Sequence, residues 1–104
     1  MPKRTTNRDC RDFVARMEPF DGSNLYARWV TDDLYVVWSW GDHWPLLAKF
    51  RHERTWMVNE DTYSRSTGRH LSQARPYGAP QRKTNTDDLL TLVETVKNGL
   101  RCAA

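Results

Sequence analysis

The sequence lacks the features that mark secreted and membrane-spanning proteins. Its longest apolar run, residues 34–38, is far shorter than the roughly 20 residues that cross a bilayer as a helix. Residues 1–8 are polar and basic and contain no apolar core of a signal peptide. We therefore expect a cytoplasmic protein that makes no contact with membranes.

Motifs for metals, cofactors and catalysis are also missing. The two cysteines, Cys10 and Cys102, belong to no CxxC or CxxxH spacing, and no two histidines lie four residues apart. We expect reduced thiols, unless the terminal segments pack together, and no metal site. There is no phosphate loop, dinucleotide fingerprint or GxSxG motif, and Asp42-His43 has no nucleophile at a recognisable spacing. These absences predict a protein that is not an enzyme and needs no cofactor.

What the chain does have is an uneven charge. The net charge is +3. Residues 51–83 carry seven basic and three acidic groups, whereas residues 17–50 carry two basic and five acidic groups. This pattern favours an acidic partner for residues 51–83, either nucleic acid or an acidic protein surface, and the alternative is a mixed solvated surface.

The pattern of apolar residues predicts one domain. At 104 residues the chain has room for a single core, which we place in residues 9–104, behind a flexible basic tail of residues 1–8. Runs of β-branched and aromatic residues predict four strands, at residues 25–30, 34–40, 46–51 and 55–59. Residues 19–24 are predicted to form a turn and residues 76–86 an exposed loop.

Three helices are predicted from apolar residues at helical spacing. The first begins at an N-cap, Asp9, and buries Cys10, Phe13, Val14 and Met17. The second begins at Ser64 or Ser66 and ends before Pro76. The third is capped by Thr86 and carries the stripe Leu89, Leu92, Val93, Val96 and Leu100. The predicted fold class is α+β, a small antiparallel meander of three to four strands with the helices packed on one face.

The polar stretch from Asn59 to His70 carries a family resemblance. Its residues Asn59, Tyr63, Ser64, Ser66, Thr67, Arg69 and His70 fit the pattern N-x(3)-Y-S-x-[TS]-T-x-[KR]-H. The stretch resembles a short domain of bacteriophages and other mobile elements, and the similarity covers residues 34–75. Gly68 and Leu71 depart from the pattern. The resemblance implies a phage setting, hence the host cytoplasm, and no agreed biochemical activity.

The same motif has two interpretations. Hydroxyl groups and backbone N–H groups at a helix N-terminus, with Arg69 beside them, suit an anion such as a phosphate. Alternatively, the hydroxyls cap the helix and Tyr63 and His70 support the junction between sheet and helix.

Aromatic and basic residues elsewhere are candidates for partner binding. Trp38, Trp40, Trp44 and Trp56, with Lys49 nearby, are either core residues or a surface that stacks bases. Trp44 lies in the Gly41–Pro45 break, where we expect an exposed ring that anchors an interface. The residues assigned to partner or nucleic-acid binding are Trp44, Arg51, Arg54, Arg69, Arg75, Arg82 and Lys83.

These observations lead to a hypothesis of binding rather than catalysis. The leading hypothesis is an anti-CRISPR-like inhibitor that docks on a host protein or ribonucleoprotein that handles nucleic acid. The alternative is direct, weakly sequence-specific binding of single-stranded nucleic acid. An enzyme that cleaves phosphoesters with His43 or His70 is the least favoured class. The sequence is compatible with a monomer or a dimer.

Overall fold

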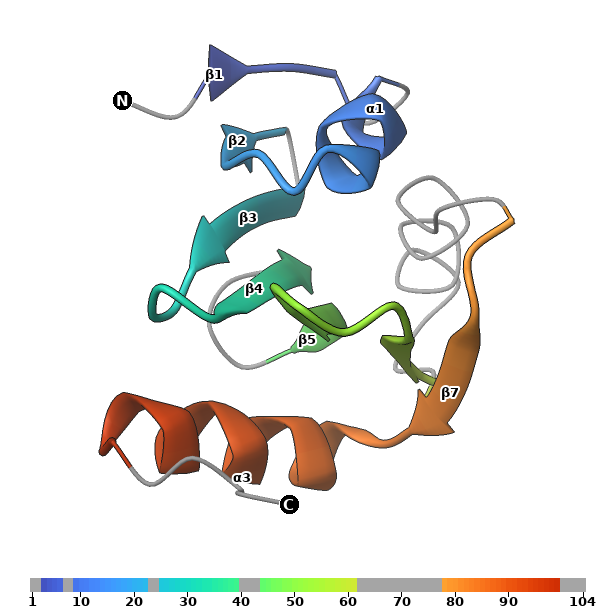
Figure 1. The fold of residues 1–104 in the computed structure, drawn as a ribbon. Helices are drawn as coiled ribbons and strands as arrows, with labels where there is room; N and C mark the ends of the chain where they lie inside the picture. Colours follow the sequence, from blue (N-terminus) through green and yellow to red (C-terminus); the bar gives the residue numbers. More distant parts are fainter. Residues whose placement is uncertain (1–2, 7–8, 23–24, 40–43, 62–77, 100–104) are drawn as a thin grey trace.

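Seven strands form one mixed sheet in the part of the chain that the structure describes (Figure 1). The structure is a computed structural model and describes residues 3–6, 9–22, 25–39, 44–61 and 78–99. The strands are β1 (Lys3–Arg4), β2 (Phe20–Asp21), β3 (Leu25–Trp29), β4 (Leu34–Ser39), β5 (Pro45–Phe50), β6 (Trp56–Asn59) and β7 (Gln81–Thr84). The helices are α1 (Cys10–Ala15) and α3 (Thr86–Lys97).

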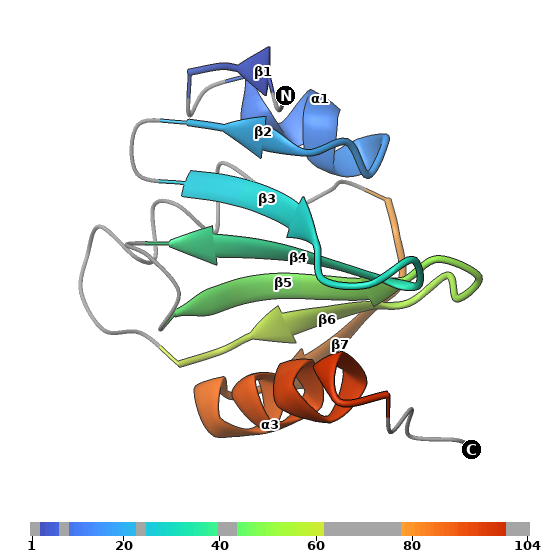
Figure 2. The same ribbon diagram turned by 90° about the vertical axis from the view of Figure 1, so that its left-hand side faces the viewer.

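The strands lie in the sheet in the order in which they occur along the chain. Figure 2 shows this order, with α3 alongside the β5, β6 and β7 end. Neighbouring strands from β2 to β6 are antiparallel, whereas β1 pairs with β2 and β7 pairs with β6 in parallel. A bulge at Val37/Trp38 in the β4–β5 pairing leaves Leu46 as the extra residue of β5.

The predicted fold class is therefore wrong in two respects, the number of strands in the sheet and the placement of the helices on it. The four predicted strands exist as β3 to β6, but the sheet continues beyond them on both sides. β2 lies in the predicted turn, β7 in the predicted loop, and β1 within the predicted tail of residues 1–8. Strands of two residues, and a strand as polar as Gln-Arg-Lys-Thr, carry no apolar alternation that a sequence pattern can detect.

The two described helices cover opposite faces of the sheet, not one. We call these the α1 face and the α3 face. Alternate residues of β4 enter two different clusters, Tyr35 and Val37 on the α1 face and Val36 and Trp38 on the α3 face. All six residues of β4 are buried, because both of its faces are covered. The α1-face cluster contains Cys10 and Val14, and the α3-face cluster contains Leu89, Val93 and Val96.

One predicted helix cap is confirmed and the other is not. Asp9 is the N-cap of α1, as predicted, although its backbone angles are helical and its side chain makes no capping hydrogen bond. Asn85, rather than Thr86, is the N-cap of α3, and its Oδ1 accepts a hydrogen bond of 2.8 Å from the backbone N–H of Asp88. The predicted second helix and Leu100 lie outside the described residues.

Candidate functional site: an aromatic groove between α3 and β3

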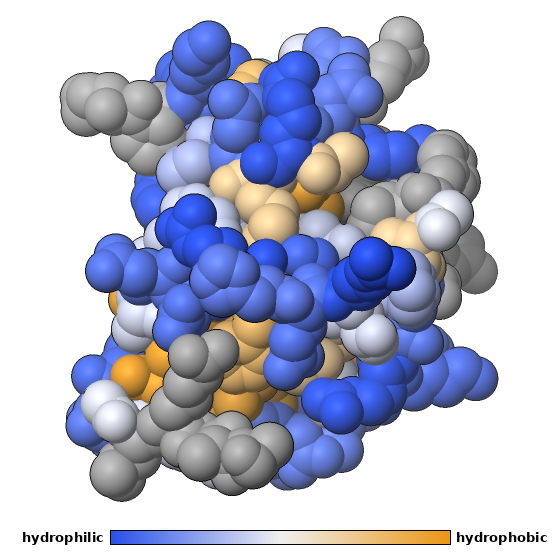
Figure 3. Space-filling view, viewed as in Figure 1, coloured by the Kyte–Doolittle hydropathy of each residue, from blue (hydrophilic) through white to orange (hydrophobic). Residues whose placement is uncertain are grey.

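A groove of about 620 Å³ separates α3 from β3 on the α3 face. It exists because α3 buries Leu89, Val93 and Val96 against the cluster that includes β4, β5 and β6, and leaves the adjoining part of β3 uncovered. We call it the aromatic groove. Its lining consists of Tyr26, Arg28, Trp29, Val30, Trp38, Leu90, Val93, Glu94 and Lys97. Figure 3 shows apolar side chains reaching the surface near α3, in the lower part of a mostly polar face.

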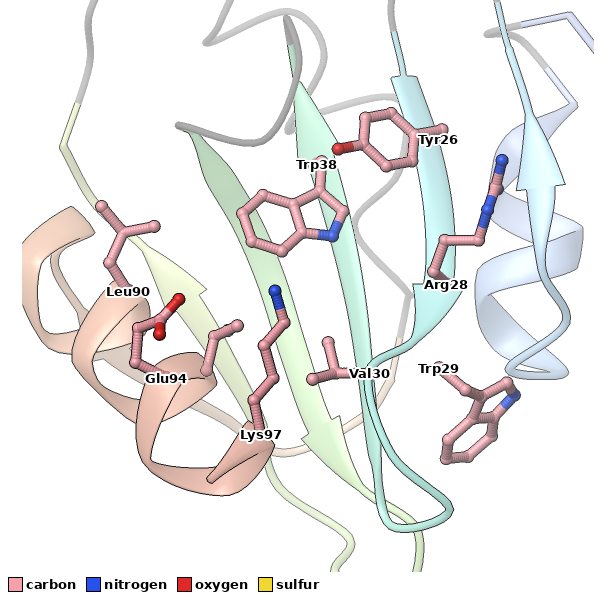
Figure 4. A pocket seen from close by; sticks show the side chains of 9 residues that line it. Tyr26, Arg28, Trp29, Val30, Trp38, Leu90, Glu94 and Lys97 are labelled. Atoms are coloured by element: carbon pink, nitrogen blue, oxygen red, sulfur yellow. The ribbon is translucent and has the colours of Figure 1, made fainter. Parts of the chain in front are cut away.

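Two aromatic rings form the floor of the aromatic groove. Tyr26 and Trp38 are cross-strand partners on β3 and β4, so their side chains project from the same face of the sheet. Their ring centroids lie 6.3 Å apart and their planes differ by 13°. Figure 4 shows the two rings side by side with their faces turned the same way. Tyr26 is half-buried, so part of its ring is open to the groove, whereas Trp38 is 6% exposed and mainly supports the Tyr26 ring from the core side.

A cation lies at each side of this floor. On the β3 side, the Arg28 guanidinium lies 5.3 Å from the centre of the Tyr26 ring and donates to the Asp21 carboxylate at 2.6 Å. It also donates to the carbonyl oxygens of Phe20 at 3.0 Å and Ala27 at 2.8 Å, which fix its orientation while 39% of the side chain stays exposed. Arg28 is therefore a positioned cation.

On the helix side, Lys97 stands in the last turn of α3, where a cation also stabilises the helix dipole. Its amino group is directed toward Trp38 in Figure 4, and it has no carboxylate within ion-pair distance among the described residues. Glu94 contributes one acidic group to the same wall. The groove therefore suits a planar group that stacks on the floor and carries an anion next to Lys97 or Arg28.

The residues expected to bind a partner do not converge on this groove. Arg51 is exposed at the end of β5, where its Nε donates to the Asp32 carbonyl at 2.8 Å and its guanidinium lies 4.4 Å from the centre of the Trp29 ring. Arg54 is exposed in the turn between β5 and β6. Arg82 and Lys83 are exposed on β7 at the far edge of the sheet. Arg69 and Arg75 lie outside the described residues.

The tryptophan residues divide between the two faces. Trp38 belongs to the α3 face, whereas Trp56 belongs to the α1-face cluster and Trp44 packs half-buried against it. Trp44 is thus less exposed than the sequence suggests, and Trp40 lies outside the described residues. The Lys49 amine lies 6.0 Å from the centre of the Trp56 ring on the α1 face, and its burial lowers the pKa of the amine. The predicted set therefore does not form a single stacking surface.

Asn59 is the motif residue that the structure describes, and its buried side chain has a structural role. Asn59 is 1% exposed. Its Nδ2 donates to the Pro45 carbonyl at 2.7 Å and to Thr86 Oγ1 at 2.9 Å, and its Oδ1 accepts from the backbone N–H of Asp61 at 2.9 Å. The side chain thus connects the start of β5, the end of β6 and the start of α3. Tyr63, Ser64, Ser66, Thr67 and His70 lie outside the described residues.

Sequence reasoning missed Tyr26, Arg28 and Lys97 as site residues. Tyr26 and Arg28 alternate along one strand, which indicates that they share a face. That they lie beside Trp38 follows from the β3–β4 register, which residue spacing alone does not give. The place of Lys97 beside β3 depends on how α3 packs on the sheet, which the sequence does not show.

Comparisons with known proteins add no assignment. Protein-family models, curated protein sequences and solved structures give no match to this chain. The resemblance to a phage domain therefore stays a prediction. Within the described residues, no three acidic, histidine or cysteine side chains gather where a metal ion could be held. The described helices are too short and too polar to cross a membrane.

Proposed function

We propose that this protein is a non-enzymatic binding protein and that the aromatic groove binds single-stranded nucleic acid with little sequence preference. The observation that carries the proposal is the partly open Tyr26 ring, held in place by Trp38, with Arg28 and Lys97 at the sides of the groove. Proteins that bind single strands combine aromatic platforms with cations that follow the phosphate backbone. A duplex would not serve as well, because its bases are already stacked on one another.

Stacking and charge make separate contributions to the proposed binding. Each base stacked on an aromatic ring contributes about 1–3 kcal/mol, and every base has a π-face, so stacking does not discriminate strongly between bases. The phosphate next to a stacked base lies close to Lys97, whose amine has no ion-pair partner among the described residues. The Glu94 carboxylate repels a phosphate that approaches the middle of α3. The nucleic-acid backbone is therefore expected to lie next to Lys97 and Arg28 instead.

The test compares the affinity of labelled oligonucleotides for matched variants by fluorescence anisotropy. Tyr26→Ala removes part of the floor, and Lys97→Glu reverses the charge at its helix side. Each is expected to weaken single-strand binding about tenfold or more. Lys83→Glu makes the same charge change on β7, away from the groove, and serves as the control. Equal affinities of Lys97→Glu and Lys83→Glu would contradict the proposal, as would absence of binding at low salt.

A second candidate is the inhibitor of host nucleic-acid-handling defence, acting in the host cytoplasm by docking on its target complex. The resemblance to phage domains supports it, and so does the exposed basic edge of β7, where Arg82 and Lys83 have no carboxylate partner among the described residues. The experiment adds the purified protein to a CRISPR effector that cleaves a target DNA. We expect cleavage to fall and the two proteins to co-elute; unchanged cleavage without co-elution would contradict this candidate.

A further inference from the structure

We propose that β7 and the adjoining side of α3 form a docking site for an extended, acidic segment of a partner protein, which adds to the sheet as a further strand. This site lies on the other side of α3 from the aromatic groove and does not depend on nucleic-acid binding. It would supply the protein contact that the inhibitor hypothesis requires.

The first observation is the open edge of the sheet. β7 is the last strand of the sheet, and no described strand pairs with its outer side. The backbone N–H groups of Trp56 and Glu60 on the β6 side donate to the carbonyls of Pro80 and Thr84. Since residues alternate in a parallel ladder, the N–H and C=O of Lys83 point away from β6. They are available to a strand laid along the edge.

The second observation is a groove of about 380 Å³ beside that edge, which we call the edge groove. Its lining includes the apolar residues Met57, Leu89 and Leu92 and the hydroxyl residues Thr84, Thr91 and Thr95. A sheet edge with a helix-lined groove beside it is a suitable receptor for a peptide strand. The peptide backbone bonds to the edge, and every second side chain enters the groove.

The third observation is the charge, which selects the partner. Arg82 lies beside Met57 in the register and lines the edge groove, as does Lys83. Both are exposed, and neither side chain has an ion pair within the described residues. The acidic residue of the same lining, Asp88, has its carboxylate engaged by Asn85 Nδ2 at 3.1 Å. Arg82 and Lys83 outweigh this one carboxylate, so the net charge of the lining is positive and fits Glu and Asp side chains.

The same charge argues against a second copy of this chain as the occupant. Two β7 strands paired edge to edge would bring Arg82 and Lys83 of one copy against the same residues of the other. Like charges opposed across strands are destabilising. An acidic strand from a different protein meets no such repulsion.

The experiment selects ligands from a displayed library of short random linear peptides and then follows amide hydrogen exchange in the unmodified protein. We expect the selected peptides to be rich in Glu or Asp at alternate positions and to slow exchange of the Lys83 amide about tenfold or more. Absence of enriched peptides, or enrichment of basic ones, would overturn the proposal. So would acidic peptides that leave the exchange of the Lys83 amide unchanged, because charge attraction without strand addition gives that result.

Two substitutions at one position then separate backbone pairing from charge. Lys83→Ala removes the amine and keeps the N–H, whereas Lys83→Pro removes both. Since this N–H does not bond to β6, proline leaves the β6–β7 ladder its donors. We expect Lys83→Pro to bind the selected peptide about tenfold more weakly than Lys83→Ala. Equal affinities would overturn strand addition.

Lys97→Glu keeps this site and alters the aromatic groove. Full peptide binding by Lys97→Glu is the expected result, and loss of peptide binding in this variant would place the peptide in the aromatic groove and overturn the proposal. The proposals for the edge groove and for the aromatic groove can thus be contradicted independently of each other.

Discussion

At the scale of single residues, two buried polar side chains hold separate elements of the structure together. Asn59 uses three hydrogen bonds to join β5, β6 and α3. The Tyr35 hydroxyl, also in the interior, donates to the Glu18 carbonyl at 2.7 Å and so ties β4 to the segment after α1. Each of these buried groups has its hydrogen-bond partner nearby. Removal of one partner therefore leaves the other polar group buried without a hydrogen bond.

We predict that Asn59→Asp lowers the free energy of unfolding by about 3 kcal/mol at neutral pH, because a carboxylate oxygen then faces the Pro45 carbonyl in place of a donor. Because burial raises the pKa of the new carboxyl group in the folded state, the deficit relative to the unmodified protein should shrink as pH falls from neutral toward about 4, the usual pKa of an aspartate in an unfolded chain. Asn98→Asp makes the same chemical change at the exposed end of α3 and should cost less than about 1 kcal/mol. Urea unfolding measures both, and equal costs would contradict the structural role of Asn59.

A second residue-scale prediction concerns alkaline pH. Burial raises the pKa of the Cys10 thiol from 9.0 to about 11. Burial, together with Cys10 and Glu18, also raises the pKa of the Tyr35 phenol. Since both groups lose protons more easily in the unfolded chain, their contribution to stability is complete below about pH 9 and is lost as pH rises toward the folded-state pKa values.

The free energy of unfolding should therefore fall by about 2 kcal/mol or more between about pH 8 and about pH 10.5. Cys10→Ala is expected to flatten the part of this fall that begins near pH 9. Urea titrations at several pH values give the slopes. A slope that is the same with and without the thiol would show that Cys10 does not titrate in this way.

At the scale of elements, regular patterns were predictable and irregular ones were not. A strand was predicted at residues 34–40 and a helix after the cap at Thr86, and the structure confirms a strand at Leu34–Ser39 and a helix at Thr86–Lys97. β7 is polar, and its pairing with β6 is a contact between segments distant in sequence. The predicted cap of α3 was one residue late, because Asn85 and Thr86 are both good capping residues and only the backbone angles distinguish them.

For α3, we predict that Asn85→Ala lowers the free energy of unfolding by about 1 kcal/mol, because the first turn loses the acceptor for the Asp88 N–H. Thr91→Ala, an exposed change within the same helix, should stay within about 0.5 kcal/mol of the unmodified protein. Chemical unfolding compares the two variants. A larger loss for Thr91→Ala than for Asn85→Ala would contradict the assigned cap.

At the scale of the whole molecule, the sheet is covered on both faces, and the sequence contained a signal of this. Residues 34–39 are apolar or aromatic at nearly every position, as in strands buried on both sides, and this signal conflicts with helices on one face only. The position of the aromatic groove depends on this layering. It lies where α3 leaves β3 uncovered, and helix placement of this kind depends on packing between distant segments.

If single strands bind in the aromatic groove as proposed, the groove's two cations determine how steeply the affinity depends on salt. For single strands, the logarithm of the affinity falls with the logarithm of the salt concentration with a slope of about −0.7 per phosphate contact. Arg28 already pairs with Asp21, so we predict a slope between about −0.7 and about −1.4, moving toward zero in Lys97→Glu. Anisotropy titrations over a range of salt give the slope. A much steeper slope, unchanged by Lys97→Glu, would place the phosphates on other basic residues.

The most direct test of the proposed binding site is to follow the nuclear magnetic resonance signals of the isotopically labelled protein during titration with a short single-stranded oligonucleotide. We expect the largest shifts at Tyr26, Arg28, Trp38 and Lys97 and no shifts in β7 and α1. Shifts centred on Arg51 and Arg54 or on β7, with the Trp38 indole signal unchanged, would contradict the assignment of the aromatic groove as the binding site.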